Sequence, residues 1–543
     1  MNEHLADRAE PDTPTPATAA TKPALHLTLV PQDAARLSRL PDFTRLRAGR
    51  PRASATRIVW HDAAELPLFR AGLALAEHRV GGRTHWRLER TVHPLGAAPE
   101  PVAEAATLVA LAERLATAGE PPLPETLLPM VAFEGTMRTF PLVAGAGASQ
   151  LKLLEGALRA VMREATVCRV AIEPSGPGAF ALARTLAAPL RLGAARQSLA
   201  GEAMELARPG ARGRRLDATL PPGLPVGDAF ARIVAGLAAD LLGEAPDAAE
   251  GIRVEPVHRM RVALRRLRSA MSLFQKAVSS PELDLLRAEL KEVARVLGPA
   301  RDWDVFLGGT GRAVAEAFAD NRSVAKMIAA ARRKREASYA ELAAMVDSPA
   351  FRRLGLTLAQ VATLRPWEHA DAIPEPPEQD TPGHETPDHE TPGHAASGGE
   401  TMGRQATLLS TELEAYAARA LRHRQKRIAG VGEDLSELPI AELHALRIQG
   451  KRLRYAAEFF APLFPGRPAR RYIRRLSAVQ ERLGRLNDAS VAASLMAELG
   501  NADRFAAGIV HGFVAAHSEN ARIKAERSWR RFVRSEPFWK TVR

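Results

Sequence analysis

Two stretches, VHRMRVALRRLRSAMSLF (257–274) and LHALRIQGKRLRYAAEFF (443–460), decide the fold of the second half of this chain. They align without a gap at an offset of 186 residues, from His258 to His444. A second pair, LGPARDWDV (297–305) and LGRLNDASV (483–491), keeps the same offset. Two blocks in one register indicate that a helical unit is duplicated within the chain.

Each copy carries a row of cationic or titratable side chains at helical spacing. A histidine is followed by cations three, seven and ten residues later. Because an α-helix turns about 100° per residue, these positions share one face, and the apolar residues on the adjoining face pack a bundle. The rows are His258, Arg261, Arg265 and Arg268 in the first copy and His444, Arg447, Lys451 and Arg454 in the second, while Arg266 and Arg452 are further cations that point off the rows.

Such rows predict an anion-binding surface. Arginine makes bidentate charge-assisted hydrogen bonds to phosphate, and a histidine adds an N–H donor or a second charge. Burying so many like charges against another helix is costly unless an anion enters with them. A single row is typical of a solvated helix face, whereas two rows in register favour the binding of a linear polyanion.

The overall charge agrees with an anionic partner. The net charge is +13 and the sequence pI is about 10.3, and polyanion-binding proteins are commonly basic. The segment after residue 405 is especially basic. It supplies secondary candidates for the site, namely Arg422, Arg424, Lys426, Arg427, Arg471, Arg474 and Arg475.

Other features limit the classes of function. The single cysteine, Cys168, excludes an intramolecular disulfide framework and any CxxC metal or redox motif. No stretch approaches 18 uninterrupted apolar residues, so we expect no membrane segment and a cytoplasmic location. We also expect no metal site and no cofactor, and the sequence leaves the oligomeric state open.

Composition divides the chain into a leader, two folded regions and an insertion. Residues 1–22 are rich in Pro, Thr and Ala without apolar periodicity, which predicts a disordered leader. A degenerate five-residue repeat predicts a disordered insertion at 371–402. We assign no metal site to its histidines, which are His384, His389 and His394.

The two folded regions, 23–208 and 218–543, differ in their patterning. The first predicts an α+β domain with antiparallel strands, among them LHLTLV (25–30), TRIVWHD (56–62) and CRVAIE (168–173). Within it, LKLLEGALRAVMREA (151–165) has the pattern of a helix. The second region consists of long amphipathic segments, which predict an all-α domain.

The duplicated blocks resemble the CHAD domain, the conserved-histidine α-helical domain. The resemblance covers 218–543 apart from the insertion, and rests on two His-x-x-Arg-x-x-x-[Arg/Lys]-Arg-Leu-Arg blocks and two Leu-Gly…Asp…Val blocks. It implies two four-helix bundles related by pseudo-twofold symmetry, with basic residues lining a central pore that binds inorganic polyphosphate. It also implies association with polyphosphate granules. By this resemblance the residues of both rows, with Arg266 and Arg452, are the expected polyphosphate ligands.

Residues 23–208 resemble a degenerate CYTH domain, the triphosphate-tunnel fold, which is antiparallel and barrel-like. PQDAARLSRL, FRAGLALAEHRVGGRTHWRLE and GPGAFALARTLAAPLRL follow the order of that family. Where the family has Glu-x-Glu-x-Lys this chain has KPALHLTLV, and Glu89 stands where a phosphate-binding lysine is expected. Only Glu173 lies near the family's later Glu pair. Because hydrolysis by this fold needs acidic ligands for Mg²⁺ or Mn²⁺, we expect this domain to be non-catalytic.

Three functions follow from these patterns. The first is a non-catalytic protein that binds inorganic polyphosphate along the helical rows. The second is a triphosphatase or polyphosphatase with residual metal-dependent activity in the CYTH-like domain, using Glu173 and Asp62. The third is nucleic-acid binding by the same basic face. Against this third function, the sequence shows no helix-turn-helix, zinc motif or aromatic RNA platform.

Overall fold

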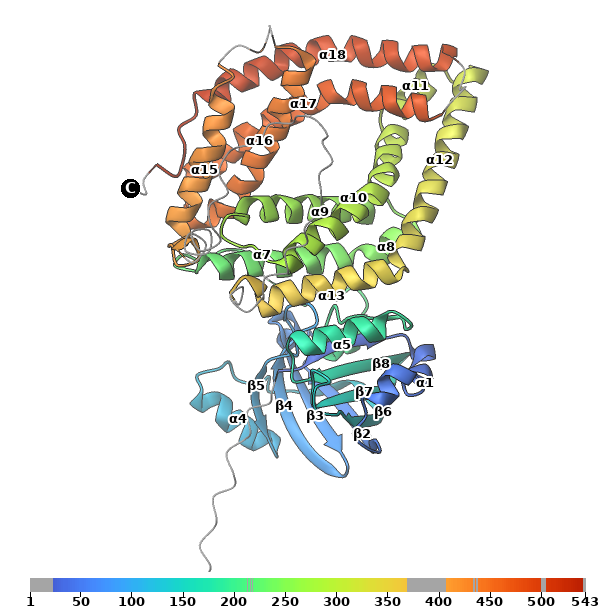
Figure 1. Cartoon of the computed structure of the whole chain (residues 1–543), viewed down its shortest axis with the longest axis vertical. Helices are drawn as coiled ribbons and strands as arrows, with labels where there is room; N and C mark the ends of the chain where they lie inside the picture. Colours follow the sequence, from blue (N-terminus) through green and yellow to red (C-terminus); the bar gives the residue numbers. More distant parts are fainter. Residues whose placement is uncertain are drawn as a thin grey trace, which may run out of the picture.

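The computed structural model describes residues 23–540 except 212, 215, 217, 369–406, 433–434, 436–437 and 500–503. The leader expected at 1–22 and the insertion expected at 371–402 therefore lie outside the described residues. The remainder confirms the predicted fold class, a domain built on an antiparallel sheet followed by an all-helical domain (Figure 1).

The first domain is organised around one nine-stranded sheet in the order β5-β4-β3-β2-β6-β7-β8-β1-β9. Every strand pair in it is antiparallel. The strands expected at 25–30, 56–62 and 168–173 are confirmed. The strands are β1 (Leu25–Leu29), β2 (Arg52–Asp62), β3 (Leu73–Val80), β4 (Arg83–Arg90), β5 (Pro101–Ala105), β6 (Leu128–Pro141), β7 (Gln150–Ala160), β8 (Arg163–Glu173) and β9 (Leu192–Ala194).

The sheet curls until its two edges meet. Just before β5, Ala97 forms an isolated bridge with Leu25 of β1. The His26 N–H donates to the Gly96 carbonyl at 2.7 Å, and the Gly96 N–H donates to the Ala195 carbonyl at 3.0 Å. Gly96 has a φ of +70°, and a Cβ there would lie 3.1 Å from the Leu25 side chain, so glycine suits this crossing. The result is the barrel-like arrangement that the sequence predicted.

The helix predicted at 151–165 is wrong. These residues form β7 and the start of β8, joined at the exposed Val161 and Met162. Helix propensities differ by only a few tenths of a kcal/mol between ordinary residues. Here β7 pairs along most of its length with β6 on one side and β8 on the other, and Leu151 and Leu153 are fully buried. Tertiary pairing and burial outweigh the local preference for helix.

Short helices cover the sheet and join it to the helical domain. One of them, α5, packs against β8 and β9 and also against α13 (Pro349–Leu364). Across this contact Arg184 Nη2 donates to Gln360 Oε1 at 2.5 Å. A single apolar core runs through the boundary, so the two domains form one packed body. The short helices are α1 (Ala34–Leu37), α2 (Pro41–Arg45), α3 (Pro67–Arg70), α4 (Leu108–Thr117), α5 (Pro177–Ala187) and α6 (Leu199–Ala207).

The helical domain contains two four-helix units in the same order. When the first unit is shifted by the repeat offset of 186 residues, every helix boundary falls within four residues of its counterpart. The duplication thus extends well beyond the two sequence blocks. The units are α7 (Val226–Gly243), α9 (Glu255–Phe274), α10 (Pro281–Gly308) and α12 (Arg322–Val346), then α15 (Leu413–Ala429), α16 (Ile440–Phe460), α17 (Arg467–Glu498) and α18 (Arg504–Val533).

The helices are arranged as a ring above the sheet domain (Figure 1). The helices α7, α8 (Ala245–Glu250) and α13 lie on the side toward the sheet, and α17 and α18 lie opposite. Contacts of α18 with α11 (Thr310–Ala317) and α12 join the units at one flank. In the part of the chain described here, none of the helices combines the length and apolar character that crossing a membrane requires.

Candidate anion-binding site

The two repeats meet where α9 and α16 end. Phe274 and Phe460 occupy equivalent positions in the two copies, both are fully buried, and their ring centroids lie 5.9 Å apart. A residue that contacts its own counterpart lies beside the axis relating the copies. The pseudo-twofold axis therefore passes between these two rings, and the cationic rows that precede them are brought onto one site.

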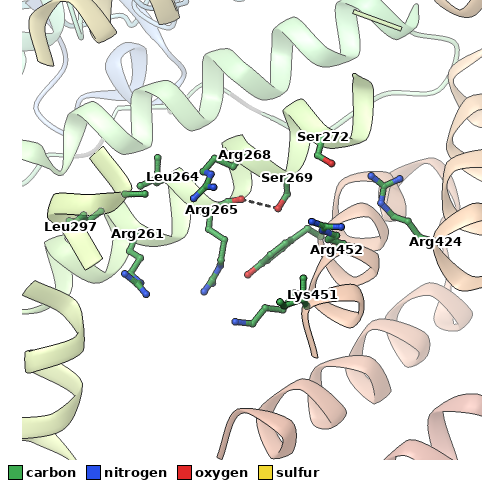
Figure 2. A pocket seen from close by; sticks show the side chains of 13 residues that line it. Arg261, Leu264, Arg265, Arg268, Ser269, Ser272, Leu297, Arg424, Lys451 and Arg452 are labelled. Carbon is green, nitrogen blue, oxygen red and sulfur yellow. Dashed lines mark hydrogen bonds between the residues drawn. The ribbon is translucent and has the colours of Figure 1, made fainter. Parts of the chain in front are cut away.

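A cavity of about 570 Å³ lies between α9 and α16. Figure 2 shows Arg261 and Arg265 pointing from α9, and Lys451 pointing from α16, into the same opening. Both rows therefore contribute side chains to one cavity. The lining consists of Arg261, Leu264, Arg265, Arg268, Ser269, Ser272, Ala294, Leu297, Arg424, Ile448, Lys451, Arg452 and Tyr455.

The two rows contribute unequally. From α9 the three arginines of the row line the cavity, whereas from α16 only Lys451 of the row does. Arg452, expected to point off the row, lines the cavity as well. The α16 residues of the lining are Ile448, Lys451, Arg452 and Tyr455, so Arg452 lies on the cavity side of its helix although its counterpart Arg266 does not. Arg266 lies outside the lining, with its guanidinium 5.1 Å from the ring centroid of Phe459.

The remaining row residues lie beside the cavity. His258 and His444 are exposed, and neither they nor Arg447 belong to the lining. Arg454 pairs with Glu458 at 3.1 Å and lies 4.9 Å from the ring centroid of Tyr455. It therefore supports the Tyr455 ring that faces the cavity.

The second repeated block positions Arg261. Asp302 on α10 pairs with the Arg261 guanidinium at 3.4 Å. One turn earlier, a Cβ on Gly298 would lie 3.4 Å from Arg261 Nη1, so the absence of a side chain leaves room for the guanidinium. The Leu-Gly and Asp of this block are thus a support for the row. The sequence assigned them no such role, although their register with the row was visible.

Among the residues that the structure describes, the cavity concentrates positive charge without a carboxylate in its lining. Burial, and then the nearby Arg447, Arg265 and Arg261, lower the pKa of Lys451 to about 8. Burial is also the main cause that lowers the pKa of Arg265 and of His258. Repulsion among these groups is relieved when an anion binds between them.

The secondary candidates divide between cavity and surface. Arg424 lines the cavity, and Arg427 lines an adjoining one. Arg475 is engaged elsewhere, because its Nη1 donates to Ser535 Oγ at 2.8 Å. Sequence reasoning assigned no role to Ser269 and Ser272. The remaining candidates, all exposed and in the lining of neither cavity, are Arg422, Lys426, Arg471 and Arg474.

The two carboxylates of the enzymatic alternative have structural partners. Asp62 is fully buried and accepts hydrogen bonds from the N–H groups of Leu68 and Phe69, at the start of α3. Glu173 pairs with Lys152 at 2.7 Å. The two residues stand level with opposite ends of β6, since Asp62 is opposite Leu128 and Glu173 is level with Pro141. They do not form a common site.

The equivalent of the family's phosphate-binding lysine, Glu89, is almost fully buried, and burial raises its pKa while Arg87 offsets part of the rise. Among the described residues there is no group of three or more His, Cys, Asp or Glu side chains placed to hold a metal ion. The first domain thus offers no acidic cluster within the described part of the chain.

Comparison with solved structures finds eight similar chains, three of which follow. The crystal structure of the CHAD domain from the plant Ricinus communis is 26% identical over 60% of this chain and 98% of its own, with a TM-score of 0.46. PptA from Streptomyces chartreusis is 18% identical over 56% and 99%, with a TM-score of 0.35. HpAC1 from Hippeastrum, described as having a dominant triphosphatase activity, is 14% identical over 29% and 81%, with a TM-score of 0.22.

A search of the curated proteins found no match. A scan against models of protein families matches the CHAD domain at residues 232–497. This range contains both His-x-x-Arg blocks and both Leu-Gly blocks, together with the cavity that the two rows line. Residues 232–497 of the chain therefore match the CHAD domain.

Proposed function

We propose that this protein binds inorganic polyphosphate in the cavity between α9 and α16 without hydrolysing it. The observation that carries the proposal is the convergence of two repeated cationic rows on one cavity whose described lining residues include no carboxylate. Arginine suits phosphate oxygens because its planar donors bind them in pairs. Several polyanions would fit such a cavity, and we choose inorganic polyphosphate because the chain resembles CHAD domains.

The shape of the site favours an extended anion. Its lining on α9 runs from Arg261 to Ser272, which is about 16 Å along a helix axis. The arginines recur at successive helix turns along this length, and the charges of a phosphate chain also recur at regular intervals. A protein with this site is expected in the cytoplasm and on polyphosphate granules.

The site is poorly suited to nucleic acid. Single-stranded nucleic acids are held by aromatic rings on which bases stack. Among the described residues of the cavity lining, Tyr455 is the one aromatic residue, and the guanidinium groups of Arg265 and Arg454 lie over its ring at 5.2 Å and 4.9 Å. We propose that nucleic acid binds only through its phosphates, and more weakly than polyphosphate.

The first domain is proposed to be a scaffold and not a hydrolase. Support comes from the structural engagement of Asp62 and Glu173 described above. Incubation of the full chain with tripolyphosphate and Mg²⁺ or Mn²⁺ is expected to release no phosphate. Release that is lost in Glu173→Gln would overturn this part of the proposal.

Calorimetric titration of the full chain with long-chain polyphosphate tests the binding. Arg265→Glu combined with Lys451→Glu is expected to weaken binding roughly 100-fold, because two charge-assisted contacts become repulsive. The matched control reverses Arg332 and Arg333, two exposed arginines of α12 outside the cavity. An equal loss in both variants, or tighter binding of RNA at equal phosphate concentration, would contradict the proposal.

A further inference from the structure

A second and larger cavity adjoins the first. It measures about 1340 Å³ and lies between the C-terminal end of α9, α15 and α16. Ser272, Arg424 and Arg452 belong to the lining of both cavities. The two spaces therefore share a boundary built from cationic and hydroxyl side chains.

The second cavity is also cationic. The described residues of its lining include no Asp or Glu. Burial is the main cause that lowers the pKa of Arg424, and Arg452 and Arg427 lower it further. Burial and then Arg427 and Lys276 lower the pKa of His423. The cations of this lining are Lys276, Arg419, Arg424, Arg427 and Arg452.

The α9 row leads from one cavity into the other. Arg261, Arg265, Arg268 and Ser272 follow one another at intervals of four, three and four residues, which keeps them on one helix face. The next position of this series is Lys276, just past the end of α9, and it lines the second cavity. An anion that extends along the row beyond Ser272 therefore meets cations without interruption.

The wall of the second cavity that lies opposite α9 comes from α15. Arg419 and Arg427 are exposed side chains of this helix, separated by about 12 Å along its axis. In the described part of the chain, neither is in an ion pair with a carboxylate. Their charges are thus available to a ligand in the second cavity.

We propose that the cavity between α9, α15 and α16 is a second subsite for the same polyphosphate chain, reached between Arg424 and Arg452. The inference rests on the proposed function and adds a preference for chain length. A short polyphosphate occupies the first cavity alone, whereas a long chain fills both. Because the second contact is made by an already bound molecule, it raises affinity for long chains selectively.

The test compares tripolyphosphate with long-chain polyphosphate on the full-length protein at fixed salt. In Arg419→Glu/Arg427→Glu we expect affinity for the long chain to fall about tenfold or more and affinity for tripolyphosphate to change less than twofold. The milder Arg419→Gln/Arg427→Gln is expected to show the same selectivity with a smaller loss. The Arg332→Glu/Arg333→Glu variant serves as the control for net charge.

Salt dependence gives a second readout. The dependence of long-chain affinity on salt concentration is expected to become less steep in the Arg419/Arg427 variants, because fewer counterions are released. If these variants bind long chains as the wild type does, or lose both ligands equally, the second subsite is refuted while the first cavity stands. If the wild-type protein binds neither ligand, the proposed function itself fails.

Discussion

The guanidinium of Arg265 on α9 lies 5.2 Å from the ring centroid of Tyr455 on α16. The same ring is 4.9 Å from the guanidinium of Arg454. An aromatic ring attracts cations to its face, so this contact holds a cation of one repeat against the other repeat. In the first copy the equivalent of Tyr455 is Ser269, and the duplicated site is therefore not symmetric in its chemistry.

Removing the Tyr455 ring should loosen Arg265. Tyr455→Ala is expected to weaken tripolyphosphate binding about three- to tenfold, which corresponds to roughly 1 kcal/mol of lost cation–π positioning. Tyr455→Phe keeps the ring and should bind within twofold of the wild type. Calorimetric dissociation constants for the three proteins provide the measurement. Equal losses in Phe and Ala would show that the hydroxyl matters and the ring does not.

The affinity for polyphosphate should depend on the ionisation of Lys451. The pKa of this amine is about 8, so it loses its charge as the pH rises through this value, and binding must then be coupled to proton uptake. We expect affinity at pH 9 to be about three- to tenfold weaker than at pH 7.

Arginine at this position stays charged throughout that range. Lys451→Arg should therefore bind with nearly the same affinity at pH 7 and pH 9. Titrations in buffers of different ionisation enthalpy would report the proton taken up by the wild type. If Lys451→Arg keeps the full pH dependence of affinity, a group other than Lys451 causes that dependence.

The charge of Lys451 should also reduce the stability of the unliganded protein. Its pKa in the folded state, about 8, lies below the ordinary value of 10.5. Between these values the unfolded state binds more protons, so this group makes stability rise with pH from about 8 to 10.5, and its destabilising effect is fully present below pH 8.

Lys451→Met is expected to raise the free energy of unfolding at pH 7 by roughly 1–3 kcal/mol, with the solvent screening of a partly exposed group taken into account. The gain should shrink toward pH 10. Denaturant unfolding of both proteins at pH 7 and pH 10 measures it. A variant that is less stable than the wild type at pH 7 would contradict the expectation. If Lys451→Met also binds polyphosphate more weakly than the wild type, the wild-type lysine reduces stability in favour of function.

At some distance from the cavity, a buried hydrogen-bond network joins α10 to α12. Asp304 accepts hydrogen bonds from Tyr339 Oη at 2.8 Å and Arg335 Nε at 2.7 Å. Asp304→Ala leaves both donors without their carboxylate and should cost about 2–4 kcal/mol of stability. Tyr339→Phe removes one hydrogen bond and should cost about 1 kcal/mol. Chemical denaturation measures the loss of stability in both variants. A larger loss in Tyr339→Phe than in Asp304→Ala would contradict the expectation.

Much of the helical domain follows from spacing alone. Residue offsets of three and four place side chains on one face of any α-helix, which is why the rows from His258 and His444 and the duplication were readable before folding was considered. By contrast, LKLLEGALRAVMREA favours a helix locally and becomes two strands, because strands from distant parts of the sequence pair with it on both sides. Local preferences of this size yield to burial and pairing.

The amino-acid sequence by itself determined the repeat, the sign of its charge and the faces on which the cations lie, since these depend only on chain order and helix geometry. Folding decided which face meets the partner helix. In the folded protein Arg452 lines the cavity whereas its counterpart Arg266 does not, and His258 and His444 lie outside the lining. Which face of each helix meets the cavity depends on how buried rings such as Phe274 and Phe460 pack, and packing depends on residues far apart in the chain.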